Sequence, residues 1–352
     1  MHRMILRVCS VLVFSTTLAT AIGSNRIDNH FHALPPAYIA ALNAAGGDPS
    51  GYPTPEWTVD AAIKSMNDVG SSVGILSISS PGVPVLGTGP EARGLARTLN
   101  EYLGNITAHG KVKDRLGFFG VLPDWQDVNG TLAELEYLYT EQRLCNGVTV
   151  FTTYGDKLLG DPLFAPIWAA LQQFHALVFI HPAVLPVNPP FIASSLAQPI
   201  IDYPLATTRT AVDLVMTGTF RRCPDVDIIL SHAGGAVPFV GTRAISSLAI
   251  PTIANEVEYS AIHAKEDFSR FYYDIAVSTS AAQLDGLLDF AESSHILFGS
   301  DFPYVPQLGI SALVAEYAAF VASNPRGSDV GPDKLRANSL ELLNKHAQKK
   351  SF

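Results

Sequence analysis

Residues 27–32 read Ile-Asp-Asn-His-Phe-His, a short run that follows an apolar start with two histidines. Three later runs have a related form. Residues 177–182 read Leu-Val-Phe-Ile-His-Pro, residues 228–233 read Ile-Ile-Leu-Ser-His-Ala, and residues 296–301 read Ile-Leu-Phe-Gly-Ser-Asp. Strands that are apolar on both faces are typical of a buried parallel sheet. The sequence therefore places an ionisable side chain directly after each of four predicted strands.

The rest of the chain repeats one pattern, in which short apolar runs alternate with longer amphipathic stretches. The eight runs that predict strands are 27–28, 73–78, 116–121, 148–151, 177–180, 226–230, 271–273 and 296–298. Stretches that predict helices between them include 90–109, 131–143, 162–174 and 204–222. Eight strands, each followed by a helix, predict a (β/α)8 TIM-type barrel of the α/β class. A doubly wound open sheet is the alternative, and we expect a single domain over residues 22–352.

The ionisable residues after these strands predict a metal site. In a barrel, the carboxyl ends of the strands meet at one face, and that face carries the active site. His30 and His32 are two residues apart in an extended chain and so point the same way. His181, His232 and Asp301 follow the fifth, sixth and eighth strands. Imidazole is a good ligand for zinc, manganese and iron, although any one histidine taken alone fits a buried, hydrogen-bonded side chain equally well.

Composition excludes several classes of protein. The chain has 352 residues, 47% of them hydrophobic and 16% charged, which is enough apolar surface for a large core and excludes general disorder. A net charge of −9 with scattered lysine and arginine argues against nucleic-acid binding. Three cysteines exclude a disulfide scaffold and a cysteine-based zinc module. No nucleotide-binding motif is evident, so we expect no organic cofactor.

The N-terminus has the layout of a secretory signal peptide. Arg3 and Arg7 precede an apolar run that ends in small residues at position 21. We expect residues 1–21 to be a signal-peptide-like segment that directs the chain to the secretory pathway, with a retained anchor or a cytosolic protein as alternatives. No other run is long enough to span a membrane, so we expect no stable membrane span in the mature form. Asn105 and Asn129 begin glycosylation sequons, which predict a glycoprotein in that compartment.

Over residues 27–343 the chain resembles the amidohydrolase superfamily. The resemblance rests on the His-x-His pair, the two later histidines and the final aspartate. Within the superfamily the chain is most similar to the aminocarboxymuconate-semialdehyde decarboxylase family of mononuclear non-oxidative decarboxylases. The segments that carry this similarity are 27–36, 77–82, 117–123, 232–239 and 298–304. Residues 154–162 most resemble the 6-methylsalicylate decarboxylase branch. Binuclear superfamily members carry a bridging lysine or glutamate after strand four, whereas this chain has threonines there and Lys157 lies in the following loop, so one metal ion is expected.

The resemblance implies a role for each candidate residue. The residues expected to bind one divalent ion, zinc or alternatively manganese, are His30, His32, His181 and Asp301. His232 is implied as the catalytic histidine, and either His232 or Asp301 as the proton donor. Arg243, on the helix after His232, is implied to contact the substrate carboxylate in its own subunit or across a homodimer, and a surface salt bridge is the alternative. Arg209 is a weaker candidate for that contact, and Asp28 is expected to orient a ligand or only to cap the loop.

The function implied is decarboxylation of a small aromatic hydroxy acid. The branch resemblance points to 6-methylsalicylate, converted to 3-methylphenol and carbon dioxide in polyketide secondary metabolism. Two alternatives stay open: a mononuclear hydrolase such as a lactonase, and a non-catalytic secreted binding protein on the same fold. Carbon dioxide release, as opposed to lactone opening, would separate the first alternative from the decarboxylase.

Overall fold

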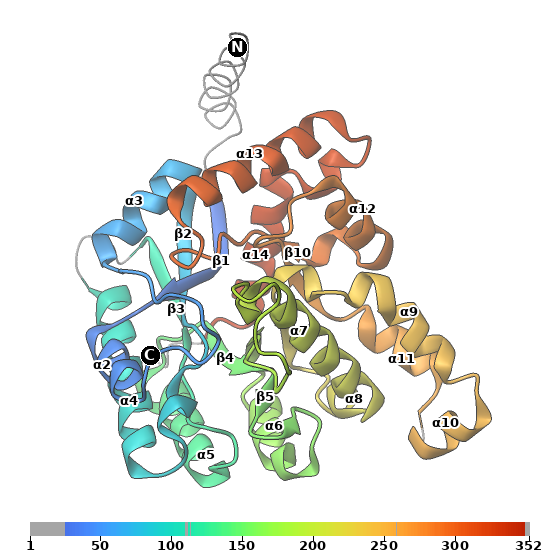
Figure 1. Cartoon of the computed structure of the whole chain (residues 1–352), viewed down its shortest axis with the longest axis horizontal. Coiled ribbons are helices and arrows are strands. Elements are labelled where there is room, and N and C mark those ends of the chain that lie inside the picture. Colours follow the sequence, from blue (N-terminus) through green and yellow to red (C-terminus); the bar gives the residue numbers. More distant parts are fainter. Residues whose placement is uncertain (1–24, 110–111, 113, 258, 349–352) are drawn as a thin grey trace.

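The computed structural model describes residues 25–109, 112, 114–257 and 259–348, and the strands within them form a closed barrel (Figure 1). Eight parallel strands pair in the order β1-β2-β3-β4-β7-β8-β9-β10. Their bounds are Arg26–Ala33, Ser71–Ile78, Leu116–Gly120, Gly147–Phe151, Leu177–His181, Asp227–Leu230, Tyr272–Asp274 and Ile296–Leu297. The first and last strands meet through a bridge between Phe31 and Phe302 and a hydrogen bond of 2.9 Å from the Asn29 amide to the Phe298 carbonyl. The predicted (β/α)8 barrel is confirmed.

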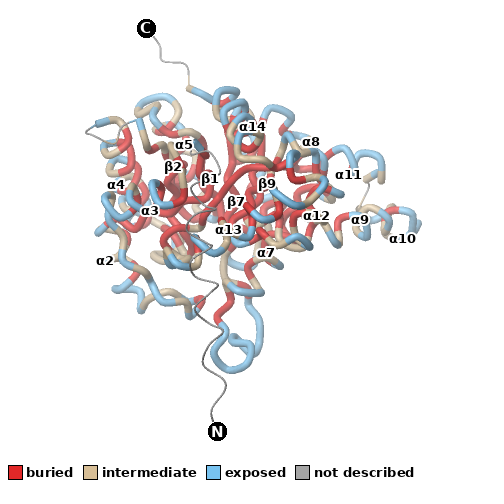
Figure 2. The backbone as a smooth tube through the Cα atoms, turned by 90° about the horizontal axis from the view of Figure 1, so that it is seen from above, coloured by how far each residue is buried: buried red, intermediate tan, exposed pale blue. Residues whose placement is uncertain are grey.

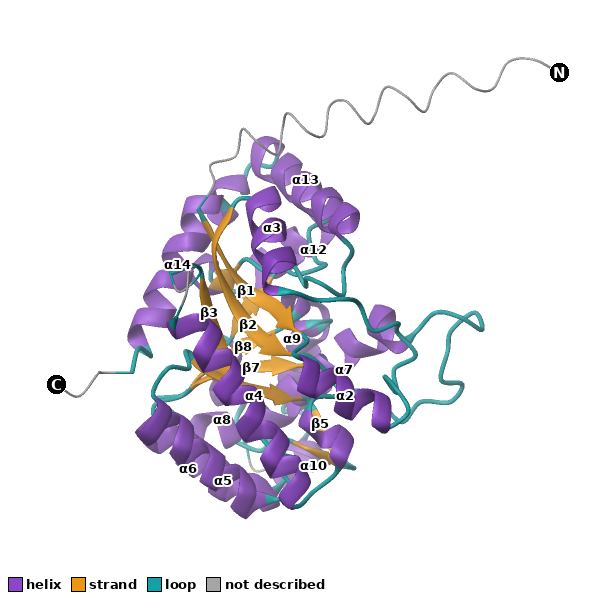
Figure 3. Ribbon diagram, turned by 90° about the vertical axis from the view of Figure 1, so that its left-hand side faces the viewer, coloured by secondary structure: helices purple, strands orange, loops and turns teal. Residues whose placement is uncertain are grey.

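Helices surround the strands, and the buried residues gather in the strands and on the inner faces of the helices (Figures 1 and 2). The helices are α2 (Pro36–Ala44), α3 (Val59–Val69), α4 (Pro90–Ala108), α5 (Val128–Glu136), α6 (Ala165–Gln173), α7 (Gln198–Met216), α8 (Thr219–Arg222), α9 (Val237–Ser247), α10 (Pro251–Val257), α11 (Ala261–Phe268), α12 (Ala281–Phe290), α13 (Gln307–Ser323) and α14 (Pro332–Lys345). A small hairpin of β5 (Thr153–Tyr154) and β6 (Lys157–Leu158) follows β4. Figure 3 shows the strands running in one direction, with long loops beyond their ends.

Alternation along the strands directs the site residues into the barrel. Leu177 and Phe179 on β7 belong to the cluster that fills the barrel, and His181 continues the same face two residues later. On β1, Ile27 also belongs to that cluster, whereas Phe31 packs in the outer core. Strict alternation would place residues 27 and 31 on one face. The pairing of β1 with β2 contains a register shift between Asp28 and Phe31, and such a shift exchanges the faces of the residues beyond it.

One predicted helix differs from the structure at both ends. Residues 204–222 were expected to form a single helix that starts at a proline. Helix α7 instead begins at Gln198, with Pro199 in its first turn, where a proline lacks only an amide that has no partner in the helix, and Pro204 lies inside the helix. The helix ends early because Gly218, with φ of 65°, turns the chain before α8.

At the opposite end of the barrel, a cluster of ion pairs joins the end of the last helix, α14, to β8. His346 Nε2 and Lys345 Nζ lie 2.7 Å and 2.6 Å from Asp227 Oδ2, and His346 Nδ1 donates to the His175 carbonyl at 2.6 Å. Burial by itself would raise the pKa of Asp227, but the contacts with His346 and Lys345 outweigh it and hold that pKa below its ordinary value. The Asp227 carboxylate therefore stabilises the fold above its unfolded pKa and loses this contribution as the pH falls through its folded pKa.

Replacing Asp227 with Asn should lower the free energy of unfolding at pH 7 by about 1–3 kcal/mol, because two donors lose a charged acceptor. The difference from the unmodified protein should shrink in acid, where the native carboxyl is itself protonated. Denaturant unfolding over a pH series measures both effects. Asp289→Asn is the matched control: its exposed pair with Arg326 should contribute less than about 0.5 kcal/mol. Equal losses of unfolding free energy in the Asp227→Asn and Asp289→Asn proteins would contradict a stabilising role for the Asp227 cluster.

Several expectations from the sequence concern the chain outside the barrel. The signal-peptide-like segment, residues 1–21, lies outside the described residues. Cys145 and Cys223 are buried free thiols. Asn105 and Asn129 are exposed, and their glycosylation stays a prediction. Within the described ranges, no individual helix has both the length and the apolar composition to cross a membrane, although α9 and α10 would meet those criteria if joined across their 99° bend.

Candidate active site

Three histidines and an aspartate converge at the carboxyl ends of the strands. Nε2 of His30 lies 3.1 Å from Nε2 of His32, and ligand atoms of both lie within 4.8 Å of one on His181. Oδ1 of Asp301 lies 3.5 Å and 3.2 Å from the same two Nε2 atoms. His30 and His32 are fully buried. Nitrogen and oxygen donors crowded at these distances fit a shared divalent cation, so the structure brings together all four predicted ligands.

Hydrogen bonds on the far side of each imidazole fix the direction of the ring. Nδ1 of His30 donates to Asp274 at 3.0 Å, and Nδ1 of His181 donates to the Pro182 carbonyl at 2.9 Å. Nδ1 of His32 lies 2.9 Å from Ser77 Oγ. Because a carbonyl or carboxylate only accepts, Nδ1 carries the hydrogen in both rings, and the neutral forms of His30 and His181 direct an Nε2 lone pair toward the centre of the cluster. Outer partners of this kind are the usual way in which metal-binding histidines are oriented.

Sequence reasoning missed Asp274, the last residue of β9. Its Oδ2 accepts from His30, and its Oδ1 accepts from the backbone amides of His232 at 3.2 Å and Ala276 at 3.0 Å. Asp274 therefore ties the strand that carries His30 to the turn that carries His232. The signal was present in the sequence, because Asp274 follows an apolar strand directly, as Asp301 does.

His232 lies beside the ligand cluster and faces the pocket. Its ring centroid is 4.7 Å from that of His30, and its Nδ1 donates to the Ala276 carbonyl at 3.1 Å. This hydrogen bond leaves Nε2 free. His232, His30 and Asp274 also form a second group whose ligand atoms lie within 4.8 Å of one another. The geometry thus places His232 beside the predicted cation site, either as a neighbour of the cation or as a further ligand.

The buried charges affect one another strongly. Burial alone would lower the pKa of His30, but Asp274 and Asp301 outweigh it and raise that pKa to about 10. Burial lowers the pKa of His232, and that of His181 lies well below its usual value. For Asp301, burial favours the neutral acid, yet the contacts with His30 and His32 hold its pKa well below the ordinary range. A divalent cation bound here takes the place of the His30 proton, so affinity for the cation rises with pH.

Backbone strain is concentrated around the same pocket. Four residues that line it have a left-handed backbone with φ between 52° and 62°: His232, Ala233, Val277 and Asp301. Non-glycine residues seldom adopt this conformation, and a β-branched residue such as Val277 does so least readily. Strained positions of this kind cluster at functional sites, where the surrounding structure imposes them.

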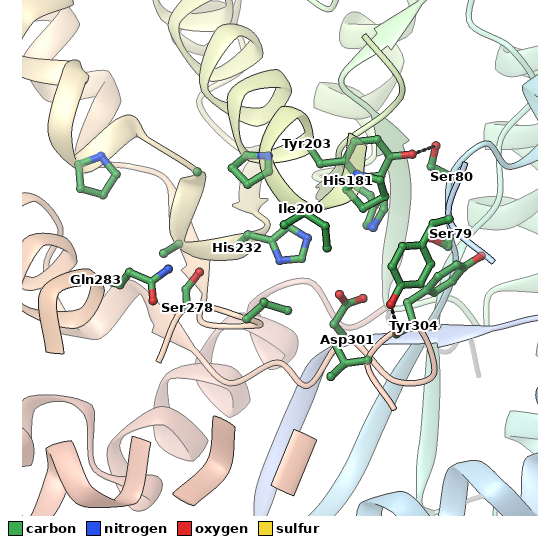
Figure 4. Close-up of a pocket in the computed structure, with 18 of the residues that line it drawn as sticks. Ser79, Ser80, His181, Ile200, Tyr203, His232, Ser278, Gln283, Asp301 and Tyr304 are labelled. Atoms are coloured by element: carbon green, nitrogen blue, oxygen red, sulfur yellow. Dashed lines mark hydrogen bonds between the residues drawn. The ribbon is translucent and has the colours of Figure 1, made fainter. Parts of the chain in front are cut away.

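A pocket of about 220 Å³ opens beside His181, His232 and Asp301 (Figure 4). Its polar lining, apart from these three residues, is Asp48, Tyr52, Ser79, Ser80, Tyr203, Ser278, Gln283 and Tyr304. Its apolar lining comes mainly from Pro199, Ile200, Pro204, Ala233, Pro238, Phe239, Val277 and Val305. No lysine or arginine lines this pocket within the described part of the chain. The pocket therefore suits a small, mostly apolar molecule with a few oxygen atoms.

The remaining candidates lie outside the pocket. Arg243 is exposed on α9, and Arg209 is exposed on α7. Lys157 pairs with Asp161 at 2.9 Å in the hairpin after β4, away from the ligand cluster. Asp28 is buried, and its Oδ1 accepts from the backbone amides of His30 at 3.3 Å and of Ser300 at 3.1 Å. Asp28 thus joins β1 to the turn that carries Asp301, and burial raises its pKa to about 7.

Known proteins resemble this chain in sequence and in fold. The sequence profile of the amidohydrolase family matches residues 27–334. A 6-methylsalicylic acid decarboxylase of Penicillium expansum is 40% identical over 283 residues, which cover 80% of this chain and 86% of that protein. The fold is similar to a crystal structure named amidohydrolase II, with a TM-score of 0.80 and 26% identity over 91% of this chain and 99% of that one.

A second solved structure is 5-carboxyvanillate decarboxylase from Novosphingobium aromaticivorans, in complex with manganese and 4-hydroxy-3-methoxy-5-nitrobenzoic acid. Its TM-score is 0.73 with 18% identity, over 92% of this chain and 96% of that one, so it supports the fold. The family match covers most of the chain, and the site retains every predicted ligand. The chain therefore belongs to the amidohydrolase family, and within it the chain is a decarboxylase of the aminocarboxymuconate-semialdehyde decarboxylase type.

Proposed function

We propose that the chain converts 6-methylsalicylate to 3-methylphenol and carbon dioxide. The observation that carries this proposal is the convergence of three imidazoles and a carboxylate beside a small pocket, which His181, Asp301 and His232 line. The similarity to a 6-methylsalicylic acid decarboxylase supports the choice of substrate. An enzyme of this kind serves a pathway of polyketide secondary metabolism, where such methylated aromatic acids arise.

The ligand set fits one divalent ion, which we propose to be zinc. His30, His32, His181 and Asp301 would hold it, because three imidazoles and one carboxylate match the donors that zinc prefers. When bound, the ion supplies a Lewis acid and a template for the carboxylate and the ortho oxygen of the substrate. Manganese, which is bound in a structurally similar decarboxylase, is the alternative, and elemental analysis of freshly purified protein distinguishes the two.

His232 is placed to move the proton that the reaction needs. Its Nε2 is free and faces the pocket, and burial keeps the ring neutral at rest by lowering its pKa. A neutral imidazole accepts the proton of the substrate's ortho hydroxyl and then donates it to the ring carbon that bears the carboxylate. The bond from that carbon to the carboxylate breaks, its electron pair restores the aromatic ring, and carbon dioxide leaves. Solvent then returns a proton to the phenolic oxygen. Asp301, held as a carboxylate by His30 and His32, serves as a ligand in this scheme.

The substrate assignment is tested by incubating metal-loaded protein with 6-methylsalicylate and measuring 3-methylphenol and carbon dioxide. The matched control is 2-methylbenzoate, which lacks the ortho hydroxyl and should not react. Decarboxylation of other ortho-hydroxybenzoates but not of 6-methylsalicylate would reject this substrate while preserving the reaction. Opening of aromatic lactones without any carbon dioxide release would favour a hydrolase instead.

We further propose that the chain is a homodimer in which Arg243 contacts the substrate carboxylate in the partner's pocket. Arg243 lies one helical turn after Phe239, which lines the mouth of the pocket and is 64% exposed. Residues four apart share a helix face, so Arg243 lies beside the mouth but outside its own pocket. A second copy of the chain that covers Phe239 at the mouth would bring its Arg243 to a pocket whose described lining has no lysine or arginine.

A mixture of an inactive His232→Ala chain with an inactive Arg243→Ala chain should regain activity when subunits exchange, because each mixed dimer then holds one complete site. Metal content should stay normal in both variants. The measurement is turnover before and after subunit exchange, with exchange itself followed by mass spectrometry of tagged chains. Exchange without recovery would place Arg243 in its own subunit's site or outside any site. Normal kinetics in the Arg243→Ala enzyme would remove it from the reaction.

We also propose that residues 1–21 direct the chain into the secretory pathway and are removed. N-terminal sequencing of the protein from its native host should find a start near Ile22. A cytosolic protein that begins at Met1 would reject this localisation.

A further inference from the structure

We propose that Gln283 and Ser278 form a second contact for the substrate carboxylate, here called the amide subsite, in addition to the metal ligands. This inference rests on the proposed function, because it assumes an aromatic carboxylate as the ligand. Figure 4 draws both side chains on one side of His232 and Asp301 on the other. The substrate would thus lie with its ortho oxygen toward the metal ligands and with its carboxylate between those ligands and the amide subsite, beside His232.

The charges of the pocket favour this orientation. Two carboxylates line the pocket, Asp48 and Asp301, and the tyrosine Tyr304 lies close enough to both for them to affect its pKa. The wall that includes Asp48 repels a free anionic group. Figure 4 places Ser278 and Gln283 across His232 from Asp301, and with Val277 they line a part of the pocket that carries no negative side chain in the described chain. A carboxylate that enters the pocket is therefore more stable on the Gln283 side.

The capping interaction of α12 fixes which end of the Gln283 amide faces the pocket. Oε1 of Gln283 accepts from the Ser280 amide at 3.3 Å and from Ser280 Oγ at 2.7 Å, which completes a capping box. A backbone N–H only donates, so the oxygen must be the atom that faces Ser280. The NH2 group at the other end of the Gln283 amide therefore faces the pocket, and it makes no hydrogen bond to any described residue. Gln283 therefore presents a donor that is held in place before any ligand arrives.

Ser278 supplies a second donor at the same wall. The residue is 4% exposed and lines the pocket. Its hydroxyl can therefore donate to an acceptor on a ligand. Val277, directly before it, has φ of 52°, so the turn that aims Ser278 into the pocket is a strained one.

The substitution Gln283→Glu separates ligand binding from helix capping. Glutamate at this position completes a capping box as glutamine does, so the fold, thermal stability and metal content should be retained. The donor becomes an anion, so affinity for an aromatic carboxylate should fall by about tenfold or more. The probe is 2-methylbenzoate, which has the carboxylate and lacks the reactive ortho hydroxyl, and its dissociation constant is measured by calorimetry on the metal-loaded full chain. Affinity for neutral 3-methylphenol should change by less than about twofold, because it has no carboxylate to lose a contact.

Ser280→Ala is the matched control, because it removes the serine hydroxyl from the cap, whereas the backbone amide of residue 280 still donates to Oε1 of Gln283 and keeps the NH2 group toward the pocket. It should lower the melting temperature and leave 2-methylbenzoate affinity nearly unchanged. If Gln283→Glu does not fold, Ser278→Ala decides instead, since it removes a donor with no capping role and should weaken 2-methylbenzoate binding several-fold.

Equal affinity of the unmodified and Gln283→Glu proteins for 2-methylbenzoate would overturn the amide subsite and leave the proposed function standing. An equal loss of affinity for 2-methylbenzoate and 3-methylphenol would also overturn it, because the effect would then be one of pocket shape. A protein that binds no aromatic carboxylate and releases no carbon dioxide from any would overturn both proposals.

Discussion

Replacing His181 with alanine should leave a folded protein that has lost most of its bound metal and nearly all of its decarboxylase activity. His181 supplies one of three imidazoles whose ligand atoms lie within 4.8 Å of one another, and its Nδ1 is already bonded to the Pro182 carbonyl. Loss of a mere outer partner typically weakens metal binding by 10–100-fold, so loss of a ligand should exceed about a hundredfold. Elemental analysis of dialysed protein and turnover of 6-methylsalicylate measure the two effects.

The control is His263→Ala, which removes an exposed histidine on α11 and should retain full metal and activity. The unmodified protein should contain one ion per chain. A full complement of metal in the His181→Ala protein would exclude His181 as a ligand. Two ions per chain in the unmodified protein would contradict the mononuclear site.

The second large effect is expected at His232. His232→Ala should keep its metal and lose at least about a hundredfold in turnover, which is the usual contribution of an acid–base group. The reason is that Nε2 of His232 faces the pocket while its Nδ1 is bonded to the Ala276 carbonyl, which holds the ring in position to transfer the proton. Steady-state kinetics measure the turnover, and elemental analysis of the same preparation measures the metal content.

The result also distinguishes two roles that the geometry allows. His232 belongs to a second group with His30 and Asp274 that satisfies the spacing of metal ligands. Metal loss in the His232→Ala protein would identify His232 as a ligand. Retained metal with retained turnover would remove it from the chemistry and direct attention to Asp301 as the proton donor.

The sequence predicted the barrel and the ligand cluster because both follow from simple periodic rules. Strands that are apolar on both faces predict a buried parallel sheet, and in a closed barrel the carboxyl ends of these strands meet at one face. His30, His32, His181 and Asp301 therefore needed only their position after a strand to be brought together. Asp274 also follows a predicted strand directly, so the same rule places it beside these ligands.

Other features depend on packing that periodicity does not encode. The register shift in β1 that aims His30 and His32 inward leaves no mark in the sequence. Pro204 was expected to start a helix and instead lies inside α7. Gln283 belongs to a helix cap and Tyr304 to a loop, and only the folded chain shows that both line the pocket. Arg243 was placed on the correct helix, but its exposure became clear only from the packing of α9.

The central claim is that this pocket carries out metal-dependent decarboxylation by protonating the ring carbon that bears the carboxylate. Its most direct test is the turnover of 6-methylsalicylate in heavy water by the metal-loaded protein, with carbon dioxide measured and 3-methylphenol examined by NMR. The account predicts one carbon dioxide per 3-methylphenol, one deuterium at the carbon between the hydroxyl and methyl groups, and loss of both signals after verified removal of the metal. Undiminished turnover by protein shown to be metal-free, or 3-methylphenol without deuterium at that carbon, would contradict it.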